Sequence, residues 1–268
     1  MTDVPACATC HAPNYWRETL RPWPNLVFVA PWLLVYELGV FFTQSPTARN
    51  GADAWLRGTL YSWGAPAGWL APAAVVTGLL VWHIGVQQSW RITWDTLLGM
   101  LSECLLFACG LILLGQMIDL AARQSGVLPV CGLATSPPSI PTRLLGFLGA
   151  GIYEEFLFRL CLFPAVYVVL RGLLAPRRWA LVGSAVMTSV AFALAHYLIP
   201  GGDVTGLTVV SEAVAQVQSR RELWFGFGFR LIAGLVFATL FCCRGFGIAV
   251  GTHAVYDIVV GWVLVSEL

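Results

Sequence analysis

Long apolar segments separated by short polar ones run from residue 25 to the end of the chain. A helix needs roughly 20 predominantly apolar residues to cross the hydrocarbon core of a bilayer. Seven segments of about this length predict seven spanning helices: 25–43, 66–86, 95–121, 142–172, 178–199, 223–243 and 245–265. The pattern therefore predicts an all-α, polytopic integral membrane protein with about seven to eight transmembrane helices.

Three segments between the predicted spans have a different character. Residues 52–63 are amphipathic and contain three aromatic side chains, so they would lie in the interface or enter the membrane as an eighth segment. Residues 200–222 begin with Pro-Gly-Gly and end with paired arginines, which favours a loop with an amphipathic helix. Residues 126–141 end in TSPPSIP and are expected to form an extended connection.

Composition supports the membrane assignment and excludes several functions. The chain is 58% hydrophobic and only 11% charged, whereas soluble domains have about 25% charged residues. A net charge of +1 without a basic patch argues against nucleic acid as a partner. The chain contains no lysine, which excludes Schiff-base chemistry and a P-loop lysine.

The N-terminal region predicts how the chain is organised, and the amino-acid composition predicts where the protein resides. Residues 1–24 are polar and Pro-rich without a signal-peptide pattern, so a polar segment is expected ahead of one helical membrane domain, 25–268. The absence of lysine and the abundance of Arg, Ala and Gly suggest a GC-rich genome. We therefore expect a multi-pass protein of the bacterial inner membrane.

Charged residues inside a predicted span indicate function, because each costs at least about 2.5–3.5 kcal/mol at mid-membrane. The stretch GIYEEFLFRL contains Glu154, Glu155 and Arg159. On an α-helix, Glu155 and Arg159 lie four residues apart on one face and can pair. Glu154 is turned by about 100° from Glu155 and is free to face a different cavity.

Three further clusters occur in later segments. Phe192 and His196 are one helical turn apart, near the Pro-Gly-Gly break. Arg230 is a lone cation at the start of a Gly-rich helix. His253 and Asp257 are again four residues apart, so the carboxylate can accept from the imidazole and fix its tautomer.

Two glutamates, an aspartate and two histidines on predicted spans indicate a hydrolase in which water attacks an amide bond inside the membrane. A partly desolvated glutamate can deprotonate a water, and a histidine can share that role or stabilise an oxyanion. Two histidines and a carboxylate would also suit Zn²⁺, but no HExxH spacing supports a metal.

The remaining ionisable residues have structural interpretations. Glu37 and Glu103 are expected to form hydrogen bonds between helices, and His83 to be a satisfied structural residue. Asp119 and Arg123 are expected to form a local pair at a helix end.

Three motifs, EEFLFR, FALAH and HAVYD, resemble those of the CAAX prenyl protease and bacteriocin-processing family, also called CPBP or Abi. The family pattern is two glutamates with an arginine four residues after the second, then Phe with His four on, then His with Asn or Asp four on. The resemblance covers roughly 142–262. It implies a glutamic intramembrane endopeptidase with about eight helical spans. Because the residues match a water-activating set and lack zincin spacing, we expect no cofactor, zinc being the alternative.

The resemblance also implies a role for each motif residue. Glu154 would activate water together with His196, and His253 with Asp257 would stabilise the oxyanion. Because Asp257 cannot donate a hydrogen bond unless protonated, we expect it to orient His253, whose imidazole is then the donor. Glu155 and Arg159 would hold the site together, with Phe192 and Arg230 as further supporting residues.

The substrate is not determined by the motifs. Eukaryotic members cleave the three residues after a prenylated cysteine, whereas many prokaryotic members are associated with bacteriocin immunity or with unknown membrane-protein processing. We expect a membrane-embedded or lipidated peptide substrate. The alternatives are a non-catalytic scaffold or immunity protein that uses the same polar network, and a proton-coupled transporter, against which no inverted repeat is visible.

The N-terminal segment contains one further motif, CxxCH, at Cys7, Cys10 and His11. The string is used for haem attachment, but here it precedes the first span without an export signal. A structural zinc site needs four ligands, and this motif supplies three. The motif is therefore either a weak zinc site or part of an unpaired polar tail.

Overall fold

The computed structural model describes residues 15–43, 48–64, 68–124, 139–198 and 207–264, and all regular structure in these ranges is helical. Each of the seven predicted spans corresponds to a helix or a run of helices. Six of them are α2 (Pro22–Thr43), α4 (Leu70–Val86), α5 (Trp94–Gln124), α8 (Arg177–Ala195), α10 (Glu222–Arg244) and α11 (Phe246–Val259).

Helices α2, α5, α8 and α10 are each long and apolar enough to cross a membrane, and α4 and α11 are shorter apolar helices. The all-helical, polytopic fold class is thus confirmed.

The remaining predicted span, 142–172, is a continuous helix whose middle is not α-helical. It consists of α6 (Ile140–Gly149), the π-helical segments η2 (Ala150–Glu154) and η3 (Phe156–Leu162), and α7 (Phe163–Gly172). A π-helix has wider turns, closed by i→i+5 hydrogen bonds. These turns end just before Pro164, which has no N–H to donate. The regular α-helical geometry expected around the two adjacent glutamates is therefore wrong.

The shorter predicted elements are also present. Residues 52–63 form α3 (Gly51–Ser62), and the amphipathic helix expected within 200–222 is α9 (Leu207–Ser219). Two short elements complete the order, α1 (Tyr15–Glu18) and η4 (Val260–Leu264). Cys7, Cys10 and His11, and most of the expected connection 126–141, lie outside the described residues.

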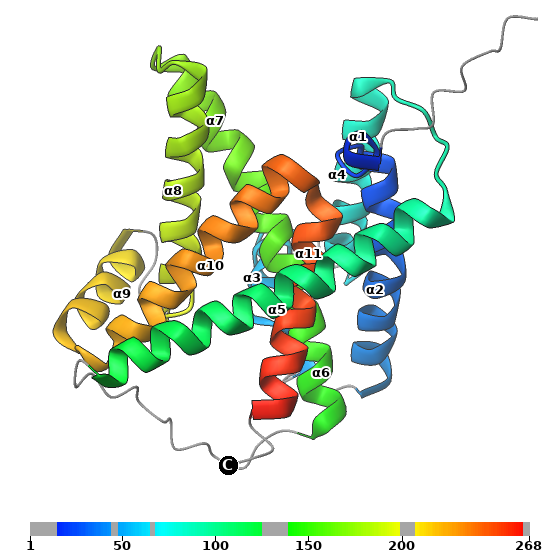
Figure 1. Ribbon diagram of the computed structural model, residues 1–268. Helices are drawn as coiled ribbons and strands as arrows, with labels where there is room; N and C mark the ends of the chain where they lie inside the picture. The colour runs from blue at the N-terminus through cyan, green and yellow to red at the C-terminus, as the bar shows by residue number, and fades with distance from the viewer. Residues whose placement is uncertain (1–14, 44–47, 65–67, 125–138, 199–206, 265–268) are drawn as a thin grey trace, which may run out of the picture.

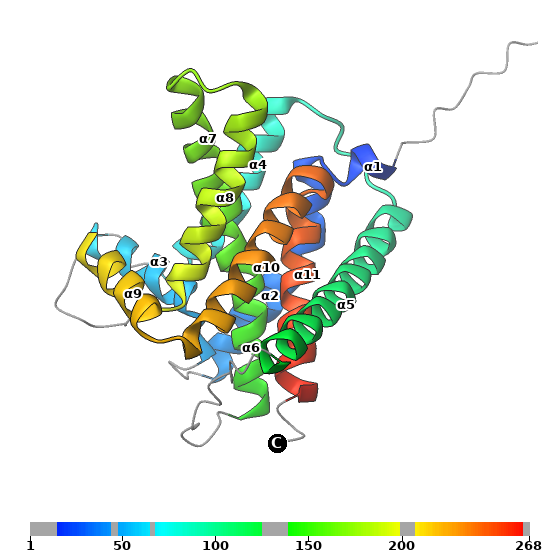
Figure 2. The ribbon, with the colours of Figure 1, turned by 60° about the vertical axis from the view of Figure 1, so that its left-hand side comes forward.

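Helix α11 is at the centre of the structure. It contacts α2, α5, α6, α10 and η2, and α5 crosses it obliquely in Figure 1. Its first nine residues, Phe246–Ala254, are all buried. On one side of α11 in Figure 1, α7 and α8 pack as a pair, and α2 and α4 pack together on the other side. Figure 2 shows α9 beside the end of α8. Residues on α11 are therefore enclosed by helices from both halves of the chain.

Two of the expected structural pairs join helices. Arg244 donates two hydrogen bonds to the Glu103 carboxylate, at 2.7 and 2.5 Å, and thereby links α10 to α5. The Glu37 carboxylate on α2 accepts from Arg57 on α3 at 2.7 Å. Both glutamates thus form the interhelical bonds predicted for them.

The other two expectations have different outcomes. Asp119 and Arg123 form the predicted local pair, with 2.8 Å between Oδ2 and Nε. His83 is buried and packs edge-on against the Trp90 ring at 4.2 Å between centroids. Neither of its ring nitrogens has a hydrogen-bond partner among the described residues, so His83 is structural but not satisfied there.

A close approach of two backbones joins the π-helical segment to α11. A Cβ atom at Gly151 would lie 2.7 Å from the Ala254 Cβ, 2.8 Å from the Ala254 nitrogen and 2.9 Å from the Val250 oxygen. Two of these atoms are backbone atoms, which cannot move aside as a flexible side chain can. Glycine at this position allows the helix that carries Glu154 and Glu155 to touch the helix that carries His253.

We expect Gly151→Ala to destabilise the protein by about 1–3 kcal/mol, because the added methyl group forces η2 and α11 apart. The matched control is Gly146→Ala in α6, where an added Cβ has nothing within 4 Å. That change should stabilise by up to about 1 kcal/mol through helix propensity. Thermal midpoints in detergent would measure both, and midpoints that move in the same direction would contradict the close approach.

Candidate active site

Three helices bring the predicted site residues together inside the protein. Glu154 and Glu155 lie where η2 meets η3, His196 directly follows the last turn of α8, and His253 lies on the buried half of α11. Residues about 100 positions apart in sequence thus form one cluster of carboxylates and imidazoles.

The two oxygens of the Glu154 carboxylate have different surroundings. Oε1 accepts a hydrogen bond from the side-chain nitrogen of Asn50 at 3.1 Å. Oε2 is buried and has no hydrogen-bond partner among the described residues. It lies 3.7 Å from Nε2 of His196 and 3.9 Å from Nε2 of His253. These distances exceed a direct hydrogen bond and suit groups that share a small molecule between them.

The tautomer of His196 follows from its backbone contact. Its Nδ1 lies 2.9 Å from the carbonyl oxygen of Phe192. A carbonyl can only accept, so Nδ1 carries the proton and donates it there. Its Nε2 atom faces Oε2 of Glu154 and is the ring nitrogen that can act as an acceptor in this tautomer.

The Glu155 carboxylate contacts two nitrogen-bearing side chains. Its Oε2 lies 3.2 Å from Nε of Arg159, and neither side chain is exposed. The contact is an ion pair without hydrogen-bond geometry, and Arg159 also donates to the carbonyl of Gly234 on α10 at 3.1 Å. Oε1 of Glu155 lies 2.9 Å from Nδ1 of His253. The predicted pairing of Glu155 with Arg159 is thus confirmed, and it extends to α11.

Asp257 lies one turn beyond His253 and approaches the other ring nitrogen. Its Oδ2 is 3.5 Å from Nε2 of His253. The shortest contact of this imidazole, however, is the one between Nδ1 and Glu155. Glu155 therefore holds the orientation of the ring, and Asp257 lies close enough to stabilise positive charge on it.

Aromatic rings pack against both imidazoles of the cluster. The ring of Phe192 lies between the two imidazoles, with centroids 5.0 Å from His196 and 5.8 Å from His253. The Arg159 guanidinium lies 5.1 Å from the same ring. Phe237 of α10, which sequence reasoning missed, stacks on His253 at 4.5 Å with an interplanar angle of 14°.

Arg230 contacts a neighbour of the cluster instead of its carboxylates. Its Nη1 donates to the Tyr197 hydroxyl at 3.1 Å, and the guanidinium lies 5.5 Å from that ring. Tyr197 directly follows His196. The structure thus places Arg230 beside the end of α8.

The described part of the chain contains no group of three or more His, Cys, Asp or Glu side chains arranged to hold a metal ion. The cofactor-free and zinc-dependent mechanisms therefore both remain predictions, which chelation can distinguish.

Residues 136–259 match the family model described as type II CAAX prenyl endopeptidase Rce1-like. The chain carries an Rce1-like endopeptidase domain. No curated protein and no solved structure matches the chain. The matched residues cover a little under half of the sequence and include every carboxylate and imidazole of the cluster.

The Rce1-like domain supports the general part of the sequence-based expectation. Together with helices long enough to span a bilayer, it indicates an integral membrane protein with peptide-bond hydrolase activity. The bacterial inner membrane stays a prediction.

Asn50 makes a polar contact with Glu154 from outside the Rce1-like domain. The dipeptide Asn50-Gly51 before an amphipathic stretch is a sequence signal for a helix start. No sequence signal relates it to a glutamate 104 positions away.

We expect Arg159→Met to lower the free energy of unfolding by about 3–5 kcal/mol, because it leaves the buried Glu155 carboxylate without its cation. The double variant Glu155→Gln/Arg159→Met should be less destabilised than this single variant. The control is Arg123→Met, which breaks an ion pair of the same spacing whose arginine is 60% exposed and should cost at most about 1 kcal/mol. An unchanged midpoint for Arg159→Met would show that the pair is not buried.

Proposed function

We propose that this protein hydrolyses a peptide bond of a membrane-embedded or lipidated substrate, through a water activated by Glu154 and His196. The observation that carries the proposal is the pair of facing acceptors, Oε2 of Glu154 and Nε2 of His196, 3.7 Å apart. Two acceptors do not attract each other, but both can accept from one water.

The first step follows from this arrangement. A water that donates to both acceptors has its oxygen lone pair free to attack a carbonyl carbon. As the O–C bond forms, the water proton that points to Glu154 moves to Oε2. The acceptor nitrogen of His196 holds the second proton and fixes the direction of attack.

His253 supplies the donor for the developing oxyanion. Its Nδ1 donates to Glu155, and its Nε2 faces Glu154 and Asp257. In this proposal the ring is an imidazolium held between two carboxylates, so Nε2–H can donate to the oxyanion. Glu154 then returns the proton to the leaving nitrogen as the C–N bond breaks, which regenerates the carboxylate.

The surroundings of the site support a membrane substrate. The cluster lies among apolar helices, several of which are long enough to span a bilayer, and within an Rce1-like domain. A prenylated CAAX-type peptide is the form of lipidated substrate that the family description suggests. A non-catalytic scaffold or immunity protein would show the same network without turnover.

Glu154→Gln should abolish cleavage of peptides by the purified protein in liposomes, because the amide cannot take the proton from water. His196→Ala should lower kcat by about 10²–10⁴-fold, the usual contribution of a general acid–base group. Farnesylated and unmodified forms of one CAAX peptide serve as substrates. Glu212→Gln makes the same chemical change at an exposed position of α9 and should retain full activity. Turnover by Glu154→Gln at the unsubstituted rate would eliminate the glutamate mechanism.

Cleavage should survive prolonged chelation and dialysis, because no step of this mechanism uses a cation. The test is made in a Cys7→Ser/Cys10→Ser background, so that zinc at the N-terminal motif does not interfere. Loss of activity on chelation, restored by zinc, would favour the metal-dependent alternative. Stoichiometric zinc that is retained in this background but lost from His253→Ala would lead to the same conclusion.

A further inference from the structure

The Asn50 side chain makes two hydrogen bonds that fix its orientation. Its Oδ1 accepts from the backbone N–H of Ala52 at 2.7 Å and thereby caps the first turn of α3. Because the amide oxygen is used by the cap, the amide nitrogen must point the other way. It donates to Oε1 of Glu154 at 3.1 Å.

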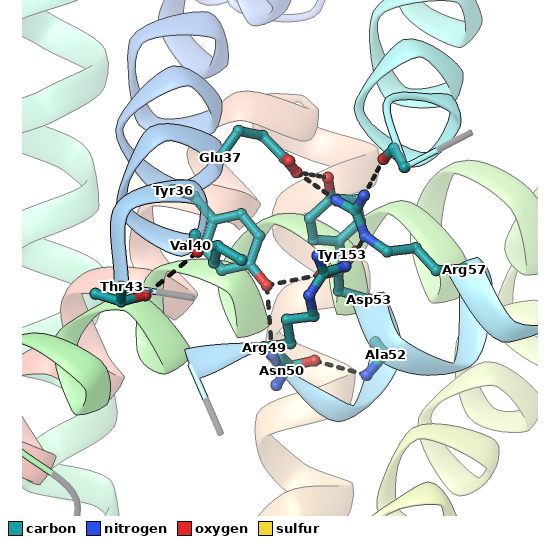
Figure 3. A network of polar contacts seen from close by, with 11 residues as sticks. Tyr36, Glu37, Val40, Thr43, Arg49, Asn50, Ala52, Asp53, Arg57 and Tyr153 are labelled. Carbon is teal, nitrogen blue, oxygen red and sulfur yellow. Dashed lines mark hydrogen bonds and ion pairs between the residues drawn. The ribbon is translucent and has the colours of Figure 1, made fainter. Parts of the chain in front are cut away.

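A polar network holds α3 beside α2 (Figure 3). The backbone N–H of Asn50 donates to the Tyr36 hydroxyl at 3.4 Å, and that hydroxyl donates to Asp53 at 2.9 Å. Arg57 then joins Asp53, at 2.5 Å, to Glu37, at 2.7 Å. Tyr36 and Asp53 are fully buried, so the hydrogen bond between them is protected from solvent.

The network returns to the residue next to Glu154. The Tyr153 hydroxyl donates to the Glu37 carboxylate at 2.5 Å, and its ring packs edge-on against Tyr36 at 5.5 Å. The contacts therefore form a closed ring that begins at Glu154, passes through α3 and α2, and ends at Tyr153. Such a ring fixes the position of Asn50 relative to Glu154 from both sides.

We propose that Asn50 is a positioning residue that assigns different tasks to the two oxygens of Glu154. By holding Oε1, Asn50 prevents rotation of the carboxylate and leaves Oε2 as the oxygen that faces both imidazoles. This proposal rests on the proposed function, since it names the residue that prepares the catalytic base. It also assigns a purpose to α3, which lies outside the Rce1-like domain.

The test separates the two hydrogen bonds of Asn50. Serine and aspartate both cap helices well, but a capping serine hydroxyl is too short to reach Glu154 and an aspartate carboxylate has no donor. Alanine neither caps nor donates. Asn50→Ser should keep the thermal midpoint within about 2 °C. It should lower kcat about tenfold or more with KM within about twofold, since a hydrogen bond to a charged group is lost. Asn50→Asp should lower kcat at least as much, because it brings a second carboxylate against Glu154.

The remaining variants control for the fold. Asn50→Ala should lower both the midpoint and kcat, and Ser62→Ala, at the exposed far end of α3, should change neither. If Asn50 served only as a helix cap, the Asn50→Ser and Asn50→Asp variants would both retain the full kcat of the unsubstituted protein. That result would overturn the proposal.

A second measurement needs no substrate. The infrared difference between the protein and its Glu154→Gln variant isolates the carboxylate band of Glu154. This band should shift in Asn50→Ser and stay in place in Ser62→Ala. An unchanged band in Asn50→Ser would overturn the contact itself. If the unsubstituted protein cleaves no peptide while the band shifts as expected, the proposed function fails and the positioning contact stands.

Discussion

The buried Glu155 carboxylate ties together the two helices on which the cluster depends. A carboxylate with no exposure is tolerated only with partners, and it has one on its own helix, Arg159, and one on α11, His253. Since removal of either partner would leave a buried charge, the register between the π-helical segment and α11 is fixed. Gly151 permits the backbone contact that this register requires. The position of the next carboxylate, Glu154, follows from it.

Adjacent glutamates take different roles here because they face different neighbours. Glu155 is enclosed by the Arg159 guanidinium and by Nδ1 of His253, so its neighbours are framework contacts on two helices. Glu154 faces acceptor and donor nitrogens at distances that leave one oxygen without a partner among the described residues. Glu154 ends the wide turns of η2, and Glu155 lies between η2 and η3. Such π-helical segments are frequent at functional sites.

Sequence alone was sufficient for the features that leave a local pattern in the chain. The seven apolar segments, the Glu155–Arg159 pair and the grouping of both histidines with Glu154 follow from hydropathy, helical spacing and motif resemblance. The π-helical turns could not be predicted, because they depend on packing against α11 and not on a local pattern. Arg230 was grouped with the cluster by its rarity in an apolar segment, yet its partner is Tyr197.

Asn50 illustrates a more general limit, because its role depends on contacts across the matched domain boundary. A bilayer supplies no hydrogen bonds, so polar groups between apolar helices must find partners within the protein. The network of α2 and α3 meets this requirement for its own residues, and it reaches η2 twice, through Asn50 at the Glu154 carboxylate and through the hydroxyl of the preceding residue, Tyr153. In the proposed mechanism the Rce1-like domain contributes the reacting groups, while helices from the preceding part of the chain restrict how the proposed base can move. A proposed base that is held in one orientation between apolar helices therefore requires residues from both halves of the sequence.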